Sequence, residues 1–228
     1  MNEFNGLFIK IGQYDHLKSL QFEGQIYCAT LQYFANLIDE QGKGDNLENV
    51  NEITYYEKAT MHLIFDYNNY DEVVSFDISG SHKYNRVTSH CGNLFCLYTI
   101  NFNDLPYNQV QKFNIDNKLG THALIIRSEL FFKKLDDALR KIGYNYCADF
   151  IEYIDFSKYS GKKTFFQKDI SFAQQKEYRI LINSPENTTL KLMIGNIEDI
   201  STLIPIEELL AKVILRADKN LQDNIICH

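Results

Sequence analysis

The segment QQKEYRILI, residues 174–182, gathers the side chains best suited to chemistry. Its alternation and its apolar end predict a strand over residues 176–183, and alternate residues of a strand share one face. Gln175, Glu177 and Arg179 are therefore expected to point the same way. Such a set is costly to bury unless each group has a partner. The other interpretation is an exposed edge strand with a Glu–Arg pair on its solvent face.

Four further polar residues are candidates for a functional or a purely structural role. His16 follows the first predicted strand, on a short helix, where an imidazole can serve as a base or a phosphate contact or simply cover the surface. His122 lies in the apolar run THALII, and we expect it in the core. Asp45 and Glu48 belong to the long polar loop 39–52; they suit a cation or a partner, with plain solvation favoured.

The five cysteines give little support to a metal centre or a disulfide framework, because their number is odd and no Cys-x-x-Cys occurs. His90, Cys91 and Cys96 lie close together, and Cys227-His228 ends the sequence. We interpret the thiols as ordinary buried groups and predict no metal. The first residues lack a signal-peptide pattern, and no apolar run approaches a membrane span. The prediction is a cytoplasmic protein without a membrane partner.

Length and charge narrow the class of protein. A chain of 228 residues with 45% hydrophobic residues is long enough for one domain, 1–228, with a sizeable core. The net charge of −7 excludes broad electrostatic binding of nucleic acid, and the paired basic residues are interpreted as solvated faces. The motifs of P-loop enzymes, Rossmann dehydrogenases, common serine hydrolases and zincins are absent. The oligomeric state is left open.

The elements that must position these side chains are mostly strands. Helices are expected at 15–20 with Asp15 as N-cap and Gly24 beyond its end, at 31–37, at 128–142 with Ser128 as cap, and at 206–213. The runs MHLIFDY and EVVSFDIS read as two short strands joined by a turn at 69–71. Further strands are expected at 7–11, 26–30, 94–102, 121–126, 148–155, 176–183 and 190–194.

Two stretches resemble known proteins. The run FFQKDISFAQQKEYRILI resembles the F-x-K…E-Y-R end of the DUF2971-like proteins, an uncharacterised bacterial and phage family. Together with FIKIGQYDHLKSLQFEGQIYCATLQYF near the start, it resembles a divergent ADP-ribosyltransferase fold. The resemblance implies an α+β fold with a split antiparallel β-sheet core of ADP-ribosyltransferase type and short flanking helices.

The same resemblance implies an NAD-dependent enzyme that modifies a protein or nucleic-acid acceptor. Glu177 would take the place of the catalytic glutamate and stabilise positive charge as the glycosidic bond of NAD breaks. Gln175 would orient the acceptor. Thr30 would support the nicotinamide ribose, and Tyr33 or Phe34 would stack on the nicotinamide ring.

The basic residues that the resemblance implies match the pattern of that fold less closely. Lys10 stands nearest the first-strand position, which is Arg or His in that fold, and would contact the pyrophosphate or the adenosine ribose. His16 falls on the following helix, and Arg179 belongs to the same proposed NAD site. The Ser-Thr-Ser run of the second strand is missing, because Thr30 is followed by Leu31.

These departures keep two other functions open. One is a non-catalytic protein of the same fold, such as a phage or mobile-element factor that binds and blocks a host defence protein. The other, ranked lower because repeated basic residues are missing, is a protein that binds nucleotides or RNA ends in the same cleft.

Overall fold

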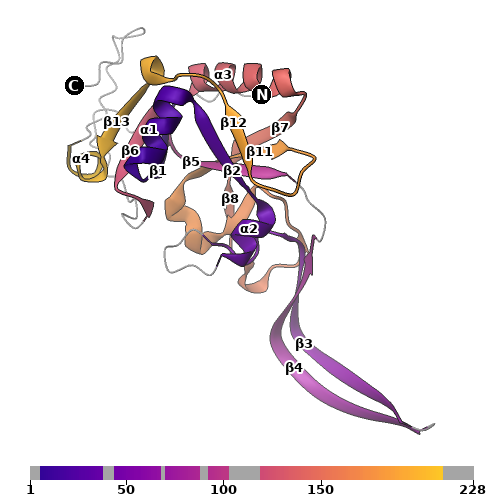
Figure 1. Cartoon of the computed structure of the whole chain (residues 1–228). Helices are drawn as coiled ribbons and strands as arrows, with labels where there is room; N and C mark the ends of the chain where they lie inside the picture. Colours follow the sequence, from indigo (N-terminus) through magenta and orange to yellow (C-terminus); the bar gives the residue numbers. More distant parts are fainter. Residues whose placement is uncertain (1–5, 38–43, 68–69, 88–91, 103–118, 213–228) are drawn as a thin grey trace.

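The computed structural model describes residues 6–37, 44–67, 70–87, 92–102 and 119–212. These form a body built on one large sheet, from which a long two-stranded arm projects (Figure 1). Helices are few and every pairing in the large sheet is antiparallel, which confirms the expected mixed α and β class.

The large sheet has eight strands. They are β1 (Gly6–Gly12), β2 (Gln25–Thr30), β5 (Asn93–Asn101), β6 (His122–Arg127), β7 (Asn145–Phe150), β11 (Glu177–Asn183), β12 (Leu190–Met193) and β13 (Ser201–Pro205). The expected strand at 148–155 is divided between β7 and a short strand of another sheet, β8 (Glu152–Ile154).

The sheet divides along β5. One edge of β5 pairs with β11 over Asn93–Tyr98, so β2 and β1 share the other edge. β2 pairs with the start of β5 at Asn93 and Leu94, and β1 pairs with its end from Tyr98 to Asn101. Between these two segments the Cys96 carbonyl accepts a hydrogen bond from Lys10 Nζ at 2.7 Å. Lys10 therefore bridges the place where the two wings of the sheet part.

The main core lies on one face of this sheet, under α1 (Tyr14–Glu23) and α3 (Ser128–Ile142). The predicted apolar stripe of α3 is confirmed: Phe131 and Leu135 are buried against the strands. Phe8 anchors the contact, with its ring centroid 5.9 Å from that of Phe131 and 5.2 Å from that of Tyr178. A smaller cluster on the opposite face packs β1 and β5 against α4 (Ile206–Lys212).

Two predicted caps are wrong, although both helices exist. α1 begins after Gln13 rather than at Asp15, and α3 begins after Arg127. The Ser128 hydroxyl instead donates to the Gly6 carbonyl at 2.7 Å, because the start of α3 is packed against β1. The predicted end of α1 is confirmed, since Gly24 adopts the left-handed conformation (φ 71°) that glycine favours.

The face of β11 away from α3 is covered by short elements. β8 runs parallel to β10 (Gln167–Asp169), and 3-10 turns cover Phe156–Lys158 and Ile170–Gln175. A third 3-10 turn, Glu198–Ile200, lies on the side of the main core, where Ile200 is buried. The strand β9 (Gly161–Lys162) joins this layer to the arm by pairing with Glu52 and Ile53. The helix α2 (Leu31–Asn36) follows β2 directly.

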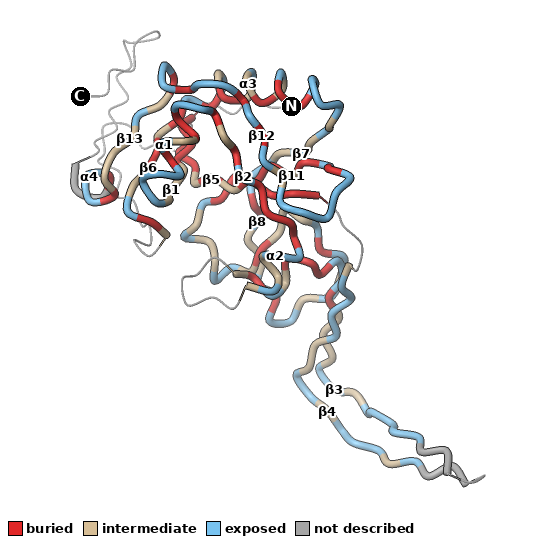
Figure 2. Tube along the Cα trace, viewed as in Figure 1, coloured by how far each residue is buried: buried red, intermediate tan, exposed pale blue. Residues whose placement is uncertain are grey.

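The arm is a single hairpin of β3 (Val50–Tyr67) and β4 (Tyr70–Arg86). The sequence predicted two short strands here, and the pairing is about twice as long, from Val50↔Arg86 to Tyr67↔Tyr70. Figure 2 shows that the base of the arm is partly buried in the body, whereas its length is mostly exposed.

Candidate functional site

A single cluster holds all the buried charged side chains of the described residues. Each of its members is at most 5% exposed, and they are Asp45, Glu48, Lys163, Lys168, Glu177 and Arg179. Three carboxylates and three cations balance one another. This balance is what allows charged groups to be buried, since an unpaired ion in a protein interior is strongly disfavoured.

Glu177 lies at the centre of the cluster with both carboxylate oxygens bound. Its Oε2 accepts from Lys168 Nζ at 2.7 Å, and its Oε1 accepts from Arg179 Nε at 2.9 Å. Its backbone N–H donates to the Tyr153 hydroxyl at 2.9 Å. β11 lies between β5 and β7, so the interpretation of this segment as an exposed edge strand is wrong.

Glu48 completes the cluster from a distant part of the chain. The Arg179 guanidinium binds it with two parallel hydrogen bonds, Nη2 to Oε1 at 2.6 Å and Nη1 to Oε2 at 2.9 Å. The same guanidinium donates to the Phe165 carbonyl. The planar fork of arginine suits such bidentate pairing, and Arg179 is fully buried. The expectation of solvated Asp45 and Glu48 is therefore wrong.

The charges of the cluster fix its protonation states. Burial raises the pKa of Glu177, but the Arg179 and Lys168 cations outweigh it and hold that pKa well below its usual range. For Lys168, burial lowers the pKa, and the Glu177 and Glu48 carboxylates more than reverse this, leaving it raised. Glu177 is thus an ionised carboxylate, and both of its oxygens already accept hydrogen bonds from cations of the same chain.

Asp45 and Lys163 lie at the edge of the cluster and have fewer hydrogen-bond partners than its central members. Asp45 Oδ1 accepts from the Leu47 N–H at 2.8 Å, whereas its buried Oδ2 has no hydrogen-bond partner among the described residues. Burial and the Glu48 charge raise the pKa of Asp45. Burial lowers the pKa of Lys163, against the pull of Glu48 and Asp45, and its Nζ makes a long 3.5 Å bond to the Thr164 carbonyl.

The cluster ties the base of the arm to the body. Glu48 lies two residues before β3, so its bond to Arg179 holds the start of that strand on the sheet. On the β4 side, Arg86 Nη1 donates to the Asn46 carbonyl and to Asn49 Oδ1, both at 2.6 Å. Below them Val50 and Ile53 pack with Phe156 in a small core of their own.

The structure brings together only part of the predicted NAD site. Gln175 lies in the 3-10 turn before β11, separated from the strand by Lys176 in the left-handed conformation, and its Oε1 accepts from Lys168 Nζ at 3.0 Å. Lys10 faces the other way. Ile9 pairs with Tyr98, which pairs with Glu177, so these three share a face and Lys10 points to the opposite one. Its Nζ lies 4.5 Å from the Phe95 ring centroid.

The remaining predicted ligands lie elsewhere. Thr30 Oγ1 accepts from the Tyr33 N–H at 3.1 Å and so caps α2. Both residues line a shallow hollow of about 360 Å³, together with Gln32, Asn36, Leu37 and Asn187, and none of the ion cluster lines it. The Tyr33 ring meets that of Phe34 edge-on at 5.5 Å. His16 is exposed on α1, and His122 is half-buried against the Tyr14 ring rather than in the core.

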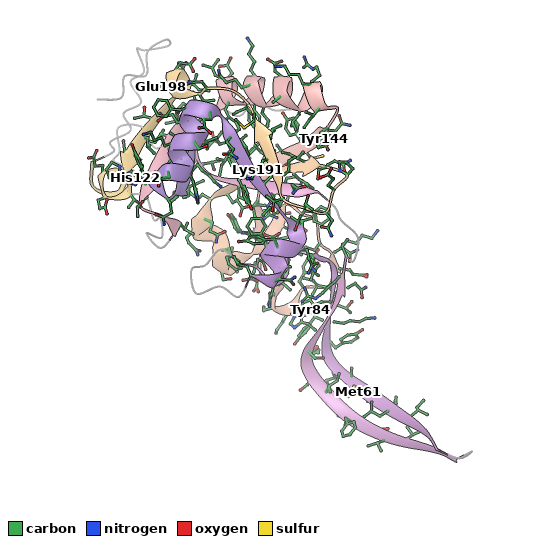
Figure 3. The ribbon with its side chains drawn as sticks, in the orientation of Figure 1. Met61, Tyr84, His122, Tyr144, Lys191 and Glu198 are labelled. Carbon is green, nitrogen blue, oxygen red and sulfur yellow. The ribbon has the colours of Figure 1, made fainter. Side chains whose placement is uncertain are left out.

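The two faces of the arm differ in the proportion of apolar residues that they carry. Directly paired residues share a face, and one face carries the apolar pairs Ala59↔Ile78, Met61↔Phe76 and Leu63↔Val74. The other carries the polar pairs Thr60↔Asp77 and His62↔Ser75 together with one apolar pair, Ile64↔Val73, whose members are 66% and 53% exposed. Met61 and Phe76 are each 45% exposed, and Figure 3 shows Met61 on the outer part of the arm, away from the body.

No group of three or more His, Cys, Asp or Glu side chains in the described ranges is placed to hold a metal ion. His90, Cys91, Cys227 and His228 lie outside those ranges. Burial raises the pKa of the Cys28 thiol to about 12, consistent with an inert buried thiol. Cys147 is exposed, so the prediction of buried thiols is wrong for that residue. Among the described residues, no helix is both long and apolar enough to cross a membrane.

Comparison of this chain with protein-family models, with curated proteins and with solved structures found no match.

Sequence reasoning did not pair Glu48 or Lys168 with β11, and it did not predict the arm as a unit. Lys168 belongs to the F-x-K motif and Glu48 to the long polar loop, but neither context indicates the partners of these residues, which lie 9 and 131 residues away. The arm did leave a signal: alternation continues from ITYYEKAT into MHLIFDY, which extends the predicted strand toward its true start.

Proposed function

We propose that this chain is a non-catalytic binding protein that uses its hairpin arm to dock on a partner protein. The observation that supports this most is the apolar face of the arm. Met61, Leu63 and Phe76 are 40–45% exposed, side by side, on a hairpin that projects from the body.

A hairpin with an apolar face is stabilised when another element or a partner protein packs on that face. A two-stranded hairpin is marginal in water by itself, and an alternating apolar face is normally packed against a third element. Contiguous exposed apolar residues on a soluble protein mark sites of interaction. The described body offers no cover beyond the base, where Tyr55 N donates to Ser160 Oγ and the His82 ring bonds the Phe156 carbonyl.

The ion cluster supports the same proposal because it leaves Glu177 unavailable to a substrate. A catalytic carboxylate must come within hydrogen-bond distance of its substrate, about 2.6–3.2 Å. Both oxygens of Glu177 are already bound to cations of the protein, and the residue is 5% exposed. Glu177 and Arg179 are better suited to hold the arm than to bind NAD.

A second candidate is the NAD-dependent ADP-ribosyltransferase that the sequence resembles. The observation in its favour is the division of the sheet at β5, with Lys10 on β1, Thr30 at the end of β2 and Glu177 at the start of β11. For this function the cluster must open so that Glu177 exchanges a cation for a ribose hydroxyl.

Capture from a lysate of the native host, compared between two matched variants, tests the first proposal. Met61→Asp with Phe76→Asp places two carboxylates on the apolar face. His62→Asp with Ser75→Asp places two on the polar face, one residue away along the same strands. Cross-linking and quantitative mass spectrometry should find proteins retained by the wild type and the polar-face variant and lost with the apolar-face variant.

Equal retention by all three proteins would remove the arm from the binding surface. The melting temperature of each variant's body is the control for folding.

A further inference from the structure

The arm has two free edges as well as an apolar face. In the described part of the chain, β4 pairs with β3 alone, and β3 has a second partner only at Glu52 and Ile53, where β9 joins it. Among the described residues, neither strand has a strand partner on its outer edge beyond Tyr55, over the ladder that ends at Tyr67↔Tyr70. Each edge is a row of donors and acceptors ready for another strand.

Several of the usual protections against strand pairing are missing from these edges. Natural edge strands are protected by proline, by lysine, by bulges or by being short. Residues 59–81 contain no Pro, Lys or Arg, and the register of the ladder shifts only at the base, between Val50 and Glu52, although Gly80 within β4 adopts the left-handed conformation (φ 61°). A long edge with few such protections is open to pairing with another strand.

The charge of the arm indicates what would pair with it. The same stretch of sequence contains Asp66, Asp71, Glu72 and Asp77 without a compensating cation. Asp77 is exposed on the polar face, where its Oδ1 accepts from Thr60 Oγ1 at 3.1 Å. A neighbouring strand would place side chains about 4.5–5.5 Å from Asp77, close enough for opposite charges to attract.

We infer that the arm takes up an extended segment of its partner protein as a third strand, and that this segment alternates apolar and basic residues. Its apolar side chains continue the Met61–Phe76 face, and its basic side chains lie beside Asp77 on the other. Main-chain hydrogen bonds supply affinity, and the two faces supply specificity. This inference rests on the proposed function and names the class of partner.

The acidic charge of the arm disfavours a second copy of the chain and an anionic lipid surface as its partner. Two arms pairing edge to edge would bring like charges together, in a protein whose net charge is already −7. Anionic lipid would be repelled in the same way. A basic segment of another protein is the occupant that the acidic arm favours.

A synthetic probe tests the inference directly. It is a capped, labelled peptide of alternating Val and Lys, about nine residues long, with its binding followed by fluorescence anisotropy. Its matched control is the same peptide with alternate amides N-methylated, which keeps every side chain and charge but removes the donors of one edge. We expect the control to bind about tenfold more weakly or worse.

A second pair of measurements checks the charge. Asp77→Lys should weaken binding of the Val/Lys peptide about threefold or more and strengthen binding of a Val/Glu peptide. Equal binding of the methylated and unmethylated peptides would overturn strand addition, while loss of binding with Met61→Asp/Phe76→Asp would leave the arm as the docking surface. Arm-dependent dimerisation in sedimentation, or arm-dependent binding to phosphatidylcholine vesicles, would overturn the choice of occupant.

Discussion

β11 and the arm are both built from alternating strands, and each exposes the type of residue that the other buries. In β11 the charged residues Glu177 and Arg179 are buried beneath β10 and the Glu48 turn. In the arm the apolar residues Met61 and Phe76 are exposed. Alternation specifies which residues share a face. Whether that face is buried depends on which other segments of the chain, or which partner protein, pack against it.

The buried ion cluster has a structural role that outweighs the cost of desolvating its charges. Buried ion pairs rarely add much net stability over apolar packing, but breaking one leaves an uncompensated charge. Glu48, Lys168 and Arg179 come from three separate segments, so their mutual satisfaction permits one arrangement of the β3 base. We interpret the cluster as the anchor that gives the arm a fixed direction.

The largest effect is expected from removing a cation at the centre of the cluster. Arg179→Met should lower the free energy of unfolding by about 3–5 kcal/mol, because Glu48 and Glu177 are left buried without it. Arg140→Met, which removes an exposed 3.8 Å pair with Asp137, should change it by less than about 0.5 kcal/mol. Urea denaturation of both proteins measures the difference. Similar values for the two would contradict an anchoring role.

Acid should weaken the cluster next. The folded-state pKa of Glu177 is depressed, so its contribution to stability is present above the unfolded pKa of about 4.3 and is lost as pH falls toward the folded value. Denaturation curves from pH 7 down to about pH 3 should show this loss in the wild type and a flatter dependence in Glu177→Gln. The same change at exposed Glu198 serves as the control and should leave the wild-type dependence intact.

Asp45 should behave in the opposite sense and by less. Its folded-state pKa is raised, so the stability that it contributes is present below the unfolded pKa of about 3.9 and is lost as pH rises through the folded value. Asp45→Asn should therefore stabilise the protein at pH 7, by about 1 kcal/mol, and have little effect near pH 3. Destabilisation at pH 7 would show that the buried Oδ2 has a partner that requires its charge.

Shortening the arm should have the smallest effect on the body. Joining Glu57 to Gly80 through an Asn-Gly turn removes the outer ladder but keeps the Tyr55–His82 contact and the base. The free energy of unfolding should change by less than about 1 kcal/mol, because the removed residues make their pairings with one another. A loss comparable to that of Arg179→Met would mean that the arm is part of the core.

Local sequence patterns predicted much of the fold but little of the candidate site. The stripe that buries Phe131 and Leu135 and the glycine that ends α1 could both be predicted, because each depends on residues within a few turns. The pairing of Glu48 with Arg179 could not, because nothing near Glu48 distinguishes a solvated loop carboxylate from one that meets a guanidinium 131 residues later. The face of Lys10 likewise depended on the register of β1 against β5.

The resemblance to ADP-ribosyltransferases gives the most direct test, because it assigns chemistry to the residue that we assign to structure. Calorimetry with millimolar NAD, with nicotinamide followed in the same sample, should be run on the wild type and on Glu177→Gln, with circular dichroism to establish that the variant is folded. We predict no NAD-dependent heat and no nicotinamide release from either protein. Release by the wild type that disappears in a folded Glu177→Gln variant would contradict the account and make Glu177 a catalytic residue.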